Sequence, residues 1–241
     1  MSLARPTTPA IKDENNRVVA GSIASLETVD LGGWKQAILI RGRDTTMPVL
    51  LFLHGGPGMP MMYLAHAFQR ELENHFLCVQ WDQRGAGKSF SENVPVETMN
   101  VEQFISDAHD LVRILRKRFN KEKVYLAGHS WGSYLGILLA KRHPELFSAY
   151  IGIGQIVDVQ KAREITGAYL RMHARELGNQ EALRDLEANG RNAHETWLFT
   201  FGNELYGKTS WMPLLVAGLF SPEYTFHDAM NIAKGPQFSG K

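Results

Sequence analysis

A chain of 241 residues, of which 44% are hydrophobic, is long enough to bury one sizeable core, with room for a small second domain. Its 26 lysines and arginines nearly cancel its 25 aspartates and glutamates, and it carries no basic stripe, so neither a nucleic acid nor an anionic membrane is expected as a partner. Cys78 is the single cysteine, and residues 1–10 lack the charged and apolar regions of a secretory signal, which predicts a cytoplasmic protein without an internal disulfide.

The first part of the chain is expected to form an arm followed by a sheet. Residues 1–20 are polar and contain proline, which predicts a loosely held N-terminal arm. Residues 22–33 and 34–42 are β-like runs joined by a Gly-Gly turn signal. Four short apolar runs follow, and such continuous runs are typical of parallel strands buried on both faces: residues 48–56, 75–85, 123–132 and 149–155.

A helix is expected between the second and the third of these apolar runs. Apolar residues recur at helical spacing from Val101 to Phe119, and Asn100 and Gln103 stand as a capping pair at its start. Strand, helix and strand in this order predict a parallel sheet with right-handed crossovers. Residues 21–157 are therefore expected to form an α/β core, a mostly parallel sheet with helices on both faces.

The chain after Gln155 shows helical patterns without strand-like runs. Gly178 and Gly190 are placed as C-terminal stops, and Thr225 with Asp228 reads as a capping box. We therefore expect residues 158–241 to form a helical cap or lid. The apolar stretch at residues 211–220 is too short to cross a membrane, because a spanning helix needs roughly 20 residues.

The stretch Gly128-His129-Ser130-Trp131-Gly132 fits the pattern GxSxG between a strand-like run and a helical pattern. A nucleophile on such a turn stands clear of the sheet, and flanking glycines remove the Cβ atoms that would clash there. Ser130 is therefore the predicted nucleophile. The backbone N–H of Trp131, at the start of the helix, is a predicted donor to an oxyanion.

Two loops are expected to complete the site. In "HGGPG", which follows the third predicted strand, the Gly56 N–H is the second candidate oxyanion donor, and the loop is shaped by His54, Gly55, Pro57 and Gly58. In "WDQRGAGKS", Asp82 and Arg84 are expected to pair or to bond to the backbone, and so to fix the loop after the fourth strand.

The motifs "HGGPG", "WDQRGAGKS" and "GHSWG", in this order, resemble the proline iminopeptidase branch of the α/β-hydrolases. The resemblance covers residues 20–155, and the helical segment is similar to that family's cap. It implies a cofactor-free enzyme, without a metal, that releases N-terminal, proline-type residues from short peptides through an acyl-enzyme. Some members hold the substrate's free amine with cap glutamates, and Glu195 and Glu204 are the candidate counterparts in this chain.

The acid and the histidine of a catalytic triad are not identified. In the α/β-hydrolase order they follow the nucleophile, yet no strand-like run followed by Asp or His occurs after Gln155. His227 is the alternative base and Asp158 the alternative acid. We expect the core to be truncated at its C-terminal side, with acid and base beyond Lys241, and the exposed sheet edge that results to permit self-association.

Three functions remain open from the residues alone. The preferred one is a serine hydrolase acting on a small peptide or amide. The second is an esterase or lactonase of the same fold, which the apolar cap permits. The third is a catalytically silent hydrolase-fold fragment that lacks the triad acid and histidine.

Overall fold

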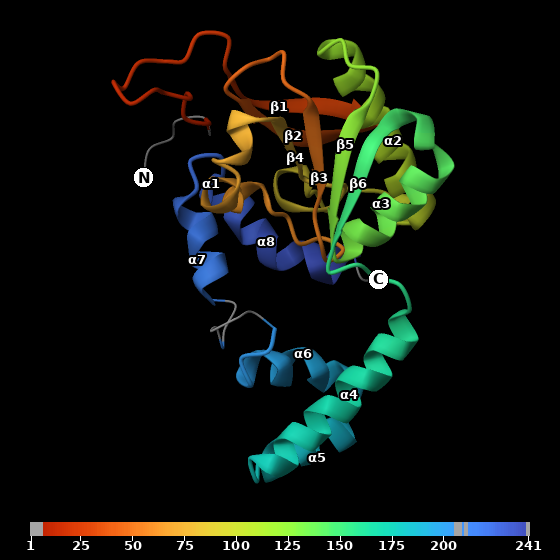
Figure 1. The fold of residues 1–241 in the computed structure, drawn as a ribbon. Coiled ribbons are helices and arrows are strands. Elements are labelled where there is room, and N and C mark those ends of the chain that lie inside the picture. The colour runs from red at the N-terminus through yellow and green to blue at the C-terminus, as the bar shows by residue number, and fades with distance from the viewer. Residues whose placement is uncertain (1–6, 205–208, 210–211, 240–241) are drawn as a thin grey trace. The chain divides into compact units, whose positions relative to one another are not determined.

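The computed structural model describes residues 7–204, 209 and 212–239. Within them six strands form one mixed sheet in the order β1-β2-β4-β3-β5-β6 (Figure 1). The strands are β1 Ile23–Leu31, β2 Trp34–Gly42, β3 Val49–Leu53, β4 Leu77–Trp81, β5 Val124–His129 and β6 Phe147–Ile153. The first two form an antiparallel hairpin, and β4, β3, β5 and β6 run parallel, which confirms the predicted parallel core.

The helices of the described residues differ widely in length. The α-helices are α1 Ala65–Phe68, α2 Val101–Arg118, α3 Trp131–Arg142, α4 Val159–Glu176, α5 Gln180–Ala188, α6 Arg191–Thr200, α7 Met212–Phe220 and α8 Phe226–Ser239. Short 3₁₀ turns are η1 Met62–Leu64, η2 Leu72–Asn74, η3 Gly87–Ser89, η4 Val96–Thr98 and η5 Pro144–Leu146. In the part of the chain that is described, no helix is long and apolar enough to cross a lipid bilayer.

The helix α2 begins where the sequence predicts. The side chain of Asn100 accepts a hydrogen bond from the Gln103 N–H at 3.0 Å and so caps the helix. The Gln103 side chain does not complete a capping box, because its amide donates to Asp107 instead. The apolar stripe of α2 then packs on the sheet, as the periodicity predicts.

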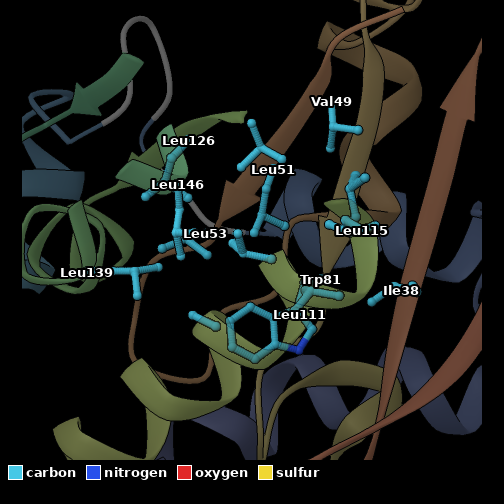
Figure 2. Close-up of a cluster of buried hydrophobic side chains, with 14 of the residues drawn as sticks. Ile38, Val49, Leu51, Leu53, Trp81, Leu111, Leu115, Leu126, Leu139 and Leu146 are labelled. Atoms are coloured by element: carbon cyan, nitrogen blue, oxygen red, sulfur yellow. The ribbon is translucent and has the colours of Figure 1, made fainter. Parts of the chain in front are cut away.

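The two faces of the sheet carry separate cores. On one face, Ile38 and Ile40 of β2 belong to a buried cluster with apolar residues of α2 and α3. Figure 2 shows part of this cluster, with Leu111 of α2 near Trp81 of β4. Their neighbours Ala37 and Leu39 point to the other face, because side chains alternate along a strand, and join a cluster with residues of η1 and α8. Helical segments therefore cover both faces.

The predicted boundary between core and cap needs a correction. The chain divides into two compact units, residues 1–155 with 215–241, and residues 156–214. Residues 215–241, expected in the cap, belong to the unit of the sheet because Ala229 and Ile232 of α8 complete the core cluster around Leu39. The described part of the predicted arm also has fixed contacts, since the Arg41 guanidinium donates to Thr8 and to the Pro9 carbonyl.

The strand β6 differs from the prediction of burial on both faces. It lies at the outer edge of the sheet, and Ile151 and Ile153 are each 45% exposed (Figure 1). The apolar run therefore indicates a strand but not how far it is buried, which depends on neighbours distant in sequence. Self-association through this edge remains a prediction.

The unit of residues 156–214 has a small core of its own. Leu170 and Ala174 of α4 pack with Ala182 and Leu186 of α5 and with Trp197 of α6. The Trp197 indole N–H donates to Asp185 at 2.7 Å. The regular elements among its described residues are all α-helices, as the sequence predicts.

Candidate active site

Ser130 occupies the turn between β5 and α3 in a backbone conformation that side chains rarely adopt, with φ of 50° and ψ of −117°. Its N–H donates to the Ile153 carbonyl at 2.9 Å, and its carbonyl accepts the N–H and the hydroxyl of Ser133 at 2.8 and 2.6 Å. These bonds hold the strained turn from both sides. They leave the half-buried Ser130 hydroxyl without a hydrogen-bond partner among the described residues.

The glycines on either side of Ser130 are required by close packing. A Cβ on Gly128 would overlap the carbonyl oxygen of Gly132, and a Cβ on Gly132 would overlap the carbonyl oxygen of Leu53 at the end of β3. Both obstacles are backbone atoms, which cannot swing aside. The motif therefore brings the start of α3 against the end of β3, next to the glycine loop.

The glycine loop approaches Ser130 from β3. A Cβ on Gly55 would lie 3.3 Å from Ser130 Cβ and 3.1 Å from His129 Nδ1, so any side chain here would crowd the hydroxyl. Gly56 has a φ of 112°, which favours glycine, and the Gly56–Pro57 peptide is cis. The loop named by the sequence thus lies directly beside the predicted nucleophile.

His54 bridges this loop to the loop after β4. Its Nε2 accepts the Gln83 N–H at 3.0 Å, so its Nδ1 carries the proton and donates to the Gly55 carbonyl at 2.9 Å. Full burial lowers the pKa of His54 to about 4, which keeps the ring neutral. The ring holds the Gly55–Gly56 peptide and is not placed as a base. Gln83, which sequence reasoning did not single out, completes the bridge by donating from its side-chain amide to the His54 carbonyl.

Two backbone N–H groups are available beside the Ser130 turn. Trp131 is the first residue of α3, where an N–H has no acceptor within the helix. The Gly56 N–H likewise makes no hydrogen bond to a described residue, while the carbonyl of the same peptide is held by His54. A helix N-terminus also favours negative charge. Unbonded backbone N–H groups of this kind are the donors that an oxyanion hole uses.

Asp82 and Arg84 are both buried, but they do not pair with each other. Arg84 donates from Nε and Nη2 to the carboxylate of Asp107 in α2, at 2.9 and 3.0 Å, and also to the Leu31 carbonyl at 3.0 Å. Asp82 accepts the Tyr224 hydroxyl at 2.5 Å and the Lys88 N–H at 2.8 Å. Each residue thus fixes its loop through a partner that lies far away in sequence.

Helix α8 supports the glycine loop, a role that sequence reasoning missed. A Cβ on Gly58 would overlap the carbonyl group of Gly235, so the two backbones touch. Asp228 in the first turn of α8 pairs with Lys88 at 2.6 Å, and the Asn231 amide donates to the Gly87 carbonyl at 3.3 Å. The sequence does contain a sign of this contact: Gly235, next to Pro236, stands inside a helical pattern, where a glycine usually has a packing reason.

Burial of Asp82 predicts a pH-dependent stability. Desolvation raises the pKa of Asp82 to about 7, and the negative charge of Asp228 raises it further. The hydrogen bonds from Tyr224 and Lys88 act in the opposite direction, and the Tyr63 hydroxyl also lies within the field of the Asp82 carboxylate. Because the pKa of Asp82 is higher in the folded state than in the unfolded state, the contribution of this group to stability is complete below about pH 4, the unfolded pKa. The contribution is lost as the pH rises from there through the folded pKa of about 7. The loss is on the order of 4 kcal/mol.

Asp82→Asn tests this expectation, because asparagine keeps an acceptor for Tyr224 and Lys88 but does not ionise. We expect the free energy of unfolding, measured by urea denaturation from pH 4 to 8, to fall more steeply in the wild type than in the variant. Asp44→Asn is the control: its pKa is lowered by hydrogen bonds from Thr46, so it should leave the slope above pH 4 unchanged. Equal slopes for wild type and Asp82→Asn would contradict the assignment.

No histidine of the described residues is seen in contact with the Ser130 hydroxyl. None hydrogen-bonds to the Ser130 hydroxyl, and His227, the alternative base, is exposed on α8. The His129 pKa is lowered by desolvation, and its ring lies beside Gly55. Asp158, the alternative acid, caps α4 by accepting the Lys161 N–H at 2.8 Å. A helix cap accounts for an aspartate at that position.

The two candidate glutamates for amine binding lie in the unit of residues 156–214. Glu195 is on α6, and Glu204 follows that helix. The pKa of Glu204 is raised by partial burial and by the charge of Glu195. The two carboxylates are therefore close enough to interact. The described residues hold no cluster of three or more His, Cys, Asp or Glu side chains arranged for a metal.

Comparison with known proteins identifies the family of this fold. Residues 48–192 match the family model for the alpha/beta hydrolase fold. The "Probable aminopeptidase YbaC" of Bacillus subtilis is 42% identical over 160 residues, which are 66% of this chain and 49% of that protein. The proline iminopeptidase of Lactobacillus helveticus is 28% identical over 114 residues, 47% of this chain and 37% of that protein.

Among solved structures, the proline iminopeptidase of Mycobacterium smegmatis superposes with a TM-score of 0.59 at 19% identity, over 90% of this chain and 68% of that chain. At this identity the likeness shows the fold. The chain spans about half the length, or less, of the curated relatives it matches. With a family model matched over more than half of its residues, the chain belongs to the α/β-hydrolase fold family.

Proposed function

We propose that the protein is a serine hydrolase that forms an acyl-enzyme on Ser130 and releases N-terminal, proline-type residues from short peptides. The observation that carries the proposal is the Ser130 turn. A serine held at φ of 50° has its hydroxyl without a described partner, beside a glycine loop with a free backbone N–H. Such strain persists where the surrounding structure holds it, and it is concentrated at functional sites.

The chemistry follows from these groups. Ser130 Oγ attacks the carbonyl carbon of the scissile bond, its proton passes to a general base, and the carbonyl electrons move to oxygen. The N–H groups of Trp131 and Gly56 stabilise that oxyanion. The leaving amine departs with the proton, and water then hydrolyses the acyl-enzyme. The base and the acid are assigned to no residue of this chain.

The choice of an aminopeptidase over an esterase is supported by the glutamate pair and by the relatives' names. The charge of Glu195 disfavours a second negative charge on Glu204. The ammonium group of a peptide's N-terminus would relieve this repulsion, whereas a simple ester offers no such charge. We propose that residues 156–214 act as the cap and that this pair binds the substrate amine.

The test measures kcat/KM of the full-length protein for three compounds: a prolyl arylamide, its N-acetyl derivative and a simple aryl ester. We expect kcat/KM for the free-amine arylamide to exceed that for the N-acetyl derivative at least about tenfold, the worth of one charge-assisted contact. Turnover of the ester alone would refute the peptidase assignment in favour of an esterase.

Variants of the pair sharpen the result. Glu195→Gln and Glu204→Gln should raise KM for the free-amine substrate and leave the aryl ester unaffected. Glu187→Gln on the exposed surface of α5 is the matched control and should change neither. Equal effects of all three substitutions would show that the pair does not bind the amine.

A further inference from the structure

A cavity lies at the end of the parallel strands opposite to Ser130. This cavity of about 260 Å³ is lined by residues 9–12, by Arg41 and Arg43 at the end of β2, and by residues around η2. Arg41 is in register with Cys78, near the start of β4, whereas Ser130 follows the last residue of β5. Since β4 and β5 both run parallel to β3, the cavity lies at the amino ends of the parallel strands.

The charges around this cavity are unbalanced. It is lined by four cationic side chains and one carboxylate: Lys12, Arg41, Arg43, Arg70 and Glu73. The buried Glu73 is neutralised by Arg41 at 2.8 Å and accepts a further hydrogen bond from Gln69 at 3.0 Å. A second guanidinium nitrogen of Arg41, Nη1, donates hydrogen bonds to the Thr8 hydroxyl and to the Pro9 carbonyl. Arg41 and Glu73 therefore form a satisfied pair, and the excess charge belongs to the other three residues.

Those three cations are paired with no carboxylate among the residues that the structure describes. Arg43 and Arg70 make no ion pair with any residue that the structure describes, and the Lys12 ammonium donates to the amide oxygen of Asn16 at 2.9 Å. His66, which also lines the cavity, is paired with the buried Glu223 at 2.6 Å. Like charges that converge on a concavity repel one another, and they attract an anion with several negative charges.

A second basic concavity, of about 580 Å³ beside α2, gives a comparison within the same molecule. Four cations line it, Arg113, Arg116, Lys117 and Lys121, together with two carboxylates, Asp30 and Asp110. Arg113 lies 3.9 Å from Asp110. This site has two carboxylates for four cations, whereas the cavity around Arg43 has one for four, and that one, Glu73, is already paired with Arg41.

We propose that the cavity around Lys12, Arg43 and Arg70 binds a small polyanion, either phosphate-bearing or a polycarboxylate. Its volume lies just under the roughly 300–1,000 Å³ of pockets for drug-sized ligands, which suits a compact anion. Two guanidinium groups supply the planar pairs of N–H donors that match phosphate and carboxylate oxygens. The inference does not depend on the proposed hydrolase activity.

The test is isothermal titration calorimetry of the complete protein with inorganic pyrophosphate and with citrate. We expect the double variant Arg43→Gln/Arg70→Gln to weaken binding at least about tenfold, since it removes charge-assisted hydrogen bonds. The matched control Arg113→Gln/Lys117→Gln lowers the net charge equally and should change the affinity by less than about twofold. Binding of one probe alone supports the site and tells a phosphate-bearing ligand from a polycarboxylate.

Two results would overturn the proposal. One is no binding of either probe by the wild type, and the other is equal weakening in the two double variants, which would reduce the effect to net charge. Should the glutamine variant fail to fold by circular dichroism, Arg43→Lys/Arg70→Lys keeps the charges but loses the planar donors. It should then bind more weakly than the wild type, and an unchanged affinity would contradict the assigned arginine contacts.

Discussion

Replacing Ser130 with alanine is expected to lower kcat by on the order of 10⁶ and to abolish labelling by a fluorophosphonate probe. The hydroxyl oxygen is the proposed attacking atom, and no neighbouring group can replace it. The oxyanion donors and the binding site would remain, so residual turnover of about 10³–10⁴ over water is expected. Intact mass after labelling and kcat on the best substrate are the two measurements.

Ser133→Ala is the matched control for this experiment. Ser133 lies three residues further along, in the first turn of α3; it is fully buried and donates its hydroxyl to the Ser130 carbonyl at 2.6 Å. Losing that bond should cost about 1 kcal/mol of stability and leave the labelling in place. Labelling that survives in Ser130→Ala would show that another residue is the nucleophile. Loss of labelling in both variants would mean that the substitutions disturb the turn, so that the loss in Ser130→Ala could not be assigned to the missing Ser130 hydroxyl.

Asp107→Ala is expected to produce the largest loss of stability, about 3–5 kcal/mol. The carboxylate is fully buried and accepts hydrogen bonds from Arg84, from the Gln36 amide at 2.7 Å and from the Gln103 amide at 2.8 Å. Alanine leaves the buried Arg84 guanidinium without a counter-charge, and that uncompensated charge causes the loss. Urea denaturation at neutral pH measures it.

An exposed ion pair between α2 and α3 serves as the comparison. Glu102 pairs with Arg142 at 2.6 Å with most of its side chain in water, so Glu102→Ala should cost about 0–1 kcal/mol. The double variant Arg84→Met/Asp107→Leu should recover most of the loss, because it removes both charges together. If Asp107→Ala costs no more than Glu102→Ala, the buried network does not stabilise the fold as argued.

Elements set by short-range chemistry could be read from the sequence. The hairpin of β1 and β2 follows from two β-like runs around Gly32 and Gly33, and α2 starts at its Asn100 cap as predicted. The turn at Ser130 was found from five consecutive residues. Periodicity, turn residues and caps act within a few positions, so they are visible without knowing what packs against them.

Partners far apart in sequence were decided only by the tertiary structure. Asp82 and Arg84 were expected to pair or to bond to the backbone. Both do bond to backbone groups, but the charged partner of Arg84 is Asp107 of α2, which no local pattern indicates. Helix α8 was expected in the cap, yet it covers the sheet face that Leu39 presents and touches the glycine loop at Gly58. Which face a helix covers depends on the alternation of side chains across the assembled sheet, and a local pattern does not encode that choice.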